Sequence, residues 1–201
     1  SLPLHISIPL GILTGLLIGI ILPPLAAHFK SFHKGYNLYN IGFTAGLIGT
    51  FVIAVLRCFG IKIETVSLVS SGNNIPFTLI LISFFIGMLI YGLYLNNWTM
   101  KGFNELLKQS GKAATDFVLL SGFGLTLINL ALLGIISTLY VIMVGGELSG
   151  PVIGGILTVV GFGAYGKHVR NIIPIIIGVS IVGCFSFHDV SSTPILLAAL
   201  F

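Results

Sequence analysis

Long apolar stretches, broken by glycine and proline and almost free of charge, decide what this chain can fold into. Only 7% of its 201 residues are charged and 56% are hydrophobic, whereas a soluble domain carries about 25% charged residues. Such a chain cannot cover a water-facing surface, but its apolar stretches can cross a bilayer as helices. The sequence therefore predicts an all-α integral membrane protein that has the lipid bilayer as its first partner.

The apolar stretches predict about six transmembrane helices. The expected spans cover residues 4–22, 38–56, 75–95, 116–144, 151–165 and 172–187. The first span is expected to end at Pro23 and Pro24, because proline interrupts helical hydrogen bonding. The fourth would be about 42 Å long against a hydrocarbon core of about 30 Å. It must therefore tilt or break, and the glycines at 122 and 124 favour a break. The last two spans are short for a crossing.

Two shorter segments complete the predicted fold. Residues 100–109 place apolar residues at helical spacing with charges between them, which is typical of an amphipathic helix on the membrane surface. Residues 194–201 would span only about 12 Å as a helix, so they form either a re-entrant half-helix or a truncated span. Cys58 and Cys184 lie in apolar surroundings and are expected to be buried thiols.

The basic residues predict the orientation in the membrane. Seven of the nine Lys and Arg residues fall in the loops after the first, third and fifth spans, and positively charged loops stay in the cytoplasm. Loops 23–37, 97–115 and 166–171 are therefore expected to be cytoplasmic, with Ser1 and residues 188–193 outside. The expected location is the bacterial cytoplasmic membrane. Because the basic residues have this role, the net charge of +4 does not indicate nucleic-acid binding.

One transmembrane domain is expected over residues 1–201, as a fragment of a longer protein, because the chain does not begin with methionine and ends inside an apolar run. A weak internal repeat relates residues 5–57 to 149–190, since Gly-Ile-Leu-Thr at 11–14 recurs at 155–158. Such matches also arise by chance in a chain rich in glycine and isoleucine. Repeats are common in transporters, where the substrate site lies between them.

A resemblance to a known family rests on two segments, HKGYNLYNIGFTAGLIG (33–49) and GELSGPVIGGILTVVGFGAYGKHVRNIIPIIIGV (146–179). They resemble a bacterial family of uncharacterised multi-pass membrane proteins, a family defined by a domain of unknown function. The resemblance covers most of the chain and implies a longer parent protein, but it carries no assigned chemistry. By analogy of fold alone, the broken spans resemble channel-like transporters such as the urea transporters.

Glu147 is the first candidate for a functional residue. It is one of only five acidic residues, and it lies beside Ser149 in a glycine-rich turn before a short span. The pair either caps the following helix or handles a substrate or proton at a discontinuous helix. The second reading depends on depth, because ionisable groups inside the membrane are costly and usually functional.

A second group of candidates precedes the C-terminal apolar run. His188, Asp189 and Ser191 stand just before Pro194. Asp, Ser and Pro are typical of a helix start, so one interpretation is that these residues only cap the following helix. The same residues would also begin a re-entrant half-helix whose backbone amides face a polar or anionic solute.

Three asparagines are further candidates. Asn129, in the middle of the fourth span, is expected either to hydrogen-bond a neighbouring helix or to line a polar path. Asn40 and Asn171 stand at span entrances, where such residues cap helices or lie at the interface. The basic cluster at 167–170 is expected to set topology, with attraction of anions as the alternative.

These features favour a membrane transporter or channel subunit for a small polar or anionic solute, without enzymatic activity. Two alternatives stay open. One is a structural or accessory subunit of a larger complex, as a homo-oligomer or with a partner subunit. The other is an intramembrane enzyme acting on a lipid-like substrate. The sequence contains no nucleotide-binding loop and no histidines with carboxylates or thiols at ligand spacing, so no cofactor or metal is expected.

Overall fold

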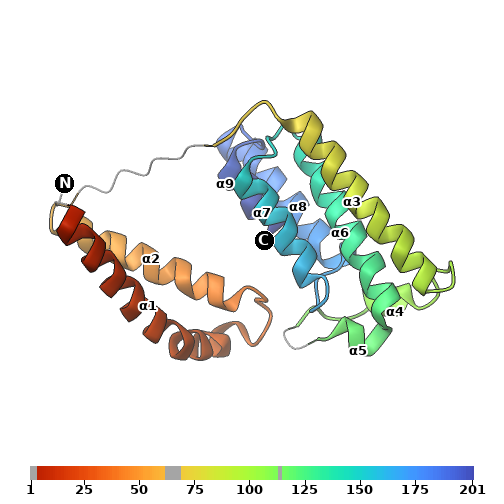
Figure 1. The fold of residues 1–201 in the computed structure, drawn as a ribbon, viewed down its shortest axis with the longest axis horizontal. Helices are drawn as coiled ribbons and strands as arrows, with labels where there is room; N and C mark the ends of the chain where they lie inside the picture. Colours follow the sequence, from red (N-terminus) through yellow and green to blue (C-terminus); the bar gives the residue numbers. More distant parts are fainter. Residues whose placement is uncertain (1–3, 62–68, 113–114) are drawn as a thin grey trace. The chain divides into compact units, whose positions relative to one another are not determined.

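A computed structural model describes residues 4–61, 69–112 and 115–201, and within these ranges the regular elements are all helices (Figure 1). The predicted all-α class is therefore confirmed for the described residues. The helices are α1 (Leu4–His33), α2 (Asn40–Cys58), α3 (Asn74–Leu95), α4 (Phe103–Leu107), α5 (Phe117–Ser121), α6 (Phe123–Met143), α7 (Gly150–Phe162), α8 (Val169–Val182), the π-helical turn η1 (Gly183–Phe187) and α9 (Thr193–Leu200).

The chain divides into two compact units, Ser1–Val66 and Ser67–Phe201. The first unit holds α1 and α2, and the second holds all the other helices. The expectations of one transmembrane domain over residues 1–201 and of a repeat relating 5–57 to 149–190 stay predictions.

In the first unit, α1 and α2 form a helical hairpin (Figure 1). The prediction that the first span ends at Pro23 and Pro24 is wrong, because α1 continues through both prolines to His33. Proline fixes φ at about −65°, which is also a helical value. The cost of the two prolines is therefore lost hydrogen bonds rather than a forbidden backbone, and an apolar membrane helix tolerates that cost.

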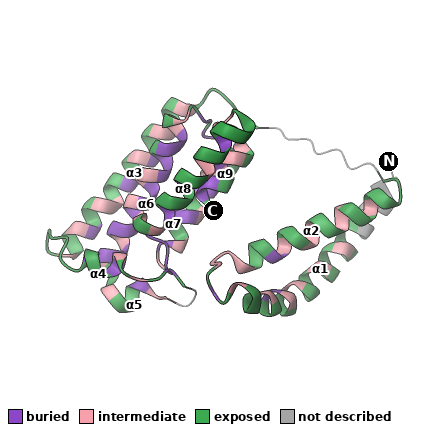
Figure 2. Ribbon diagram, turned by 180° about the vertical axis from the view of Figure 1, so that it is seen from behind, coloured by how far each residue is buried: buried purple, intermediate pink, exposed green. Residues whose placement is uncertain are grey.

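The second unit is built around α6, which packs along α3 (Figure 2). In the apolar window of α6, 61% of the residues are buried, against 17% in α3, so α6 is the central helix. The two helices approach closely at Gly92, where a Cβ atom would lie 3.0 Å from the carbonyl oxygen of Gly124. Further along, the ring of Phe85 fills the space that a side chain at Gly134 would need. Small residues thus set the spacing of the α3–α6 pair.

The predicted break in the fourth span is confirmed. α5 ends at Ser121, α6 begins at Phe123, and Gly122 between them has φ 83° and ψ 161°. Only glycine adopts this backbone conformation readily. Asp116 fixes the start of α5, because its Oδ1 accepts hydrogen bonds from the backbone N–H of Val118 (2.9 Å) and of Leu119.

Five helices among the described residues are long and apolar enough to cross a membrane: Gly11–His33, Asn40–Cys58, Asn74–Leu95, Phe123–Met143 and Val169–Phe187. The segment expected as the fifth of six spans is α7, whose 13 residues cover only about 20 Å. Many apolar side chains of the five helices face outward. Cys58 and Cys184 do so too, which corrects their expected burial. Since lipid is as apolar as a protein interior, such residues need no cover from the protein itself.

The two shorter predicted segments are both helical. α4 lies within the amphipathic segment 100–109, with Phe103 and Leu106 buried. α9 covers most of residues 194–201, follows η1 and packs on α7 and α8. The contact with α7 is close at Gly155, where a Cβ atom would lie 2.9 Å from a methyl carbon of Leu197 and would have to displace it.

Candidate functional site

The turn between α7 and α8 carries the most unusual polar groups of the second unit, since Lys167 is only 6% exposed and His168 only 2%. Glycines allow the turn to pack tightly. Gly166 has φ 127° and lies against the backbone of Gly111, where a Cβ atom would meet the Gly111 carbonyl oxygen at 3.2 Å. A side chain at Gly166 would therefore push the turn away from the loop that precedes α5. We call Asn129, Lys167 and His168 the turn cluster.

Asn129 ties α6 to this turn. Its Nδ2 donates hydrogen bonds to the backbone carbonyls of Gly163 and Lys167, each at 2.8 Å. Two carbonyl acceptors fix the orientation of the amide, because the reversed amide would point an oxygen at both of them. Asn129 Oδ1 is buried and accepts no hydrogen bond from the described residues. An acceptor left unsatisfied in an interior costs about 1–3 kcal/mol, so a donor from water or a ligand would stabilise it.

His168 presents a second acceptor at the same turn. Its Nε2 lies 3.0 Å from the backbone oxygen of Gln109, and its ring stacks on Phe117 with centroids 6.3 Å apart. Burial lowers the pKa of His168; the bond to Gln109 opposes this shift and the charge of Arg170 adds to it. The ring is therefore neutral at pH 7. A carbonyl only accepts, so Nε2 carries the proton and Nδ1 is an acceptor. Nδ1 is buried and has no hydrogen-bond partner among the described residues.

Lys167 contributes a buried cation from the same turn. Its Nζ donates to the backbone oxygens of Phe201 (3.0 Å) and Leu200 (3.4 Å), at the C-terminal end of α9. Burial lowers the pKa of Lys167 from 10.5 to about 8, so the side chain is mostly charged at pH 7. A cation at the C-terminal end of a helix is favoured by the helix dipole. Lys167 thus joins the turn cluster to α9.

Asn171, a predicted candidate, lies at this turn and holds it in shape. Its Oδ1 accepts from the backbone N–H of His168 at 2.9 Å, and its Nδ2 donates to the carbonyl of Gly166 at 2.9 Å. Asn171 thus acts as a cap at the start of α8, one of the roles expected for it. Asn129 and Asn171 are the two predicted candidates that lie at this turn.

Glu147 and Ser149 lie in the loop between α6 and α7, at the other end of the second unit (Figure 1). Glu147 is exposed, whereas Ser149 is buried and its Oγ has no hydrogen-bond partner among the described residues. Asn74 fixes this loop, since its Nδ2 donates to the carbonyl of Gly146 (2.9 Å) and its Oδ1 accepts from the N–H of Leu148 (2.8 Å). The carboxylate is therefore presented outward from a fixed loop.

His188, Asp189 and Ser191 form the turn between η1 and α9. His188 is exposed and has φ 52°, in the left-handed region. Asp189 Oδ1 accepts from the backbone N–H and the hydroxyl of Ser191, at 2.8 and 2.9 Å, and from the N–H of Ser192 at 3.3 Å. These hydrogen bonds lower the pKa of Asp189 to about 2. Asp189 therefore stays ionised and organises the start of α9.

Asn40 belongs to the first unit and closes its hairpin. Its Nδ2 donates to the carbonyl of Ala26 at 2.9 Å, and its Oδ1 lies 2.8 Å from Nε2 of His33. The side chain thus joins the start of α2 to α1. Among the described residues, no group of three or more His, Cys, Asp and Glu side chains lies close enough to hold a metal ion.

Sequence reasoning assigned Lys167 and His168 to a surface cluster and so missed their burial. One signal could have pointed to it. Gly161, Gly163 and Gly166 precede or flank the pair, and glycines at such density allow neighbouring backbones to close over a turn.

The chain matches the family described as "Protein of unknown function (DUF1576)" over residues 1–58 and 95–201. No curated protein and no solved structure matches it. The family match covers more than half of the chain and includes the turn cluster. It confirms the resemblance to a family without assigned chemistry, and this chain belongs to the DUF1576 family of proteins of unknown function.

Proposed function

We propose that this chain is a membrane transporter or channel subunit for a small polar or anionic solute, with the turn cluster on the solute path. The observation that carries the proposal is that Asn129 Oδ1 and His168 Nδ1 are buried acceptors without a partner among the described residues, at a turn that also holds the buried Lys167. Polar groups inside a membrane protein are costly and usually mark substrate paths. A solute with N–H or O–H groups would satisfy the two acceptors, and the positive charge of the turn would favour an anionic one.

The broken helices support the same proposal. Many transporters build their substrate sites from discontinuous helices. Here α5 and α6 are separated at Gly122, α7 has only 13 residues, and α9 has eight. In the proposed arrangement the chain makes six crossings, with α7 as the short fifth one, and α9 is a re-entrant half-helix whose C-terminal end meets Lys167.

The distribution of charge supports a position for the turn cluster at the cytoplasmic end of the solute path. The described Lys and Arg residues of the second unit all lie in the segments at one end of it: Lys101, Lys108, Lys112, Lys167 and Arg170. By the positive-inside rule, 97–115 and 166–171 are cytoplasmic and 188–193 is outside. The same rule would put loop 23–37 in the cytoplasm; Ser1 lies outside the described residues.

The test is uptake by proteoliposomes that contain the purified chain, with a panel of small anions and a matched panel of neutral polar solutes. Lys167→Met keeps the length of the side chain and removes its charge, and it should reduce anion uptake at least about tenfold while affecting neutral solutes less. Lys101→Met is the matched control, because Lys101 is exposed at the same end. Absence of uptake by the wild type across both panels would contradict the transport proposal. Equal uptake by Lys167→Met and the wild type would show that the turn cluster does not lie on the solute path.

An accessory subunit is the second candidate, and the first unit favours it. Gly11, Gly15 and Gly19 repeat at every fourth residue of α1, and a Cβ atom on any of them would meet nothing within 4 Å. Such a face suits close packing against another membrane helix. Stable co-purification of a partner chain that Gly15→Leu abolishes, without uptake by the complex, would favour this candidate over transport.

A further inference from the structure

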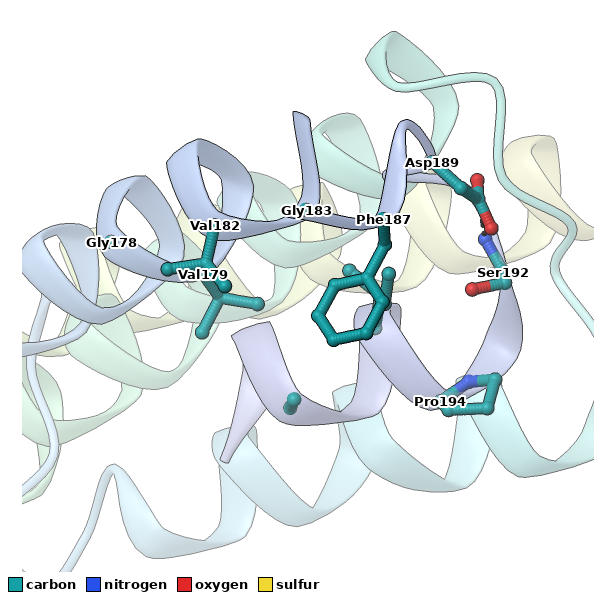
Figure 3. Close-up of a pocket in the computed structure, with 10 residues that line it drawn as sticks. Gly178, Val179, Val182, Gly183, Phe187, Asp189, Ser192 and Pro194 are labelled. Carbon is teal, nitrogen blue, oxygen red and sulfur yellow. Dashed lines mark hydrogen bonds between the residues drawn. The ribbon is translucent and has the colours of Figure 1, made fainter. Parts of the chain in front are cut away.

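A groove of about 710 Å³ lies between α9 and the continuous segment of α8 and η1 (Figure 3). Its walls are mostly apolar, with Val179, Val182 and Phe187 on one side and Ile195 on the other. Pockets that bind small molecules have volumes of about 300–1,000 Å³. The groove is therefore large enough for a substantial part of an amphiphile.

The groove has one polar end. Asp189 and Ser192 lie there, beyond Phe187, whereas Val179 lies towards the other end (Figure 3). The carboxylate of Asp189 is held in place by the N–H and hydroxyl of Ser191. These bonds keep the carboxylate ionised at neutral pH. The apolar groove thus ends at a fixed negative charge.

No ion pair joins Asp189 to a Lys, Arg or His side chain of the described chain. The adjacent His188 is exposed, and the basic residues of the second unit that the structure describes lie at its other end, within 101–112 and 167–170. A carboxylate beside an apolar surface and without a cationic partner attracts a positively charged group. Charge and shape together favour an amphiphile with a cationic head.

We propose that this groove binds an aminophospholipid of the surrounding bilayer, with one acyl chain along Val179 and Phe187 and the ammonium group of the head at Asp189. The groove opens among outward-facing apolar side chains, including Val182 (51% exposed) and Phe187 (65% exposed). In an integral membrane protein such side chains meet lipid, so phospholipid is the amphiphile that reaches the groove first. This site is separate from the turn cluster and does not depend on transport.

The test is lipid retention by the purified chain after incubation in equimolar phosphatidylethanolamine and phosphatidylglycerol with identical acyl chains. Mass spectrometry of the retained lipid should show phosphatidylethanolamine enriched about fivefold, as expected for one exposed ion pair. This competition uses the wild type and needs no variant. Equal retention of the two lipids, or a preference for phosphatidylglycerol, would overturn the proposal.

Three variants locate the lipid. Asp189→Asn keeps an oxygen that accepts the bonds of Ser191, so the turn is preserved while the preference for phosphatidylethanolamine is lost. Gly178→Leu should reduce retention of both lipids, because Gly178 lines the groove and a Cβ atom there meets nothing within 4 Å. Gly154→Leu is the matched control, since Gly154 is also open but does not line the groove. Unchanged selectivity in Asp189→Asn, or unchanged retention in Gly178→Leu, would place the lipid elsewhere and refute the site.

Discussion

The buried ammonium of Lys167 makes the stability of the second unit depend on pH in a defined direction. Burial lowers its pKa from 10.5 to about 8, and at 1.36 kcal/mol per pKa unit this corresponds to about 3 kcal/mol. Below pH 8 the folded and unfolded chains both hold the proton, so Lys167 does not make the free energy of unfolding depend on pH there. Between about pH 8 and 10.5 the unfolded chain holds the proton and the folded chain releases it. The free energy of unfolding therefore rises with pH in this range.

Thermal unfolding of the detergent-solubilised chain, followed by circular dichroism at 222 nm, would measure this effect between pH 7.5 and 9.5. The expected gain of about 2 kcal/mol between pH 8 and 9.5 would raise Tm by roughly 4–8 °C in a chain of this size. Lys167→Met should abolish the rise, whereas Lys101→Met should keep it. Parallel curves for the wild type and Lys167→Met would refute the reasoning, because the titrating group would then not be Lys167.

Three further predictions concern packing, acid and the broken span. Gly134→Ala should lower the free energy of unfolding by about 1–3 kcal/mol in thermal melts, because the new methyl overlaps the Phe85 ring; Phe85→Leu should restore part of this loss in the double variant. The pKa of Asp189 in the folded chain is lowered to about 2, so its contribution to the free energy of unfolding is present above about pH 4 and is lost as pH falls towards 2. The Tm of Asp189→Asn should therefore depend less on pH between 5 and 3 than the Tm of the wild type, and an equal acid dependence would contradict this. Gly122→Ala should cost about 1–3 kcal/mol because of its positive φ, whereas Gly178→Ala, in open helical space, should not lower Tm.

The turn cluster shows why the sequence could indicate a residue without indicating its chemistry. Asn129 could be selected as a polar group in an apolar span, because hydropathy is a local property. Its partners could not be predicted, since Gly163 and Lys167 lie 34 and 38 residues further along the chain. Only the packing of α6 against the α7–α8 turn decides which carbonyls meet the amide and which oxygen is left without a donor.

The sequence by itself determined those features that depend on residues close together in the chain. The lack of charge predicted helices that are apolar and long enough to cross a membrane, and the break at Gly122 followed from the mismatch between the expected span length and bilayer thickness. The end of α1 was mispredicted, because the prediction considered only the helix-breaking tendency of Pro23 and Pro24. It did not include the stabilisation that the apolar helix on both sides of them provides. Tertiary structure alone decided the burial of Lys167 and the groove beside Asp189. Both depend on where α9 docks, and docking is set by contacts between residues far apart in the chain.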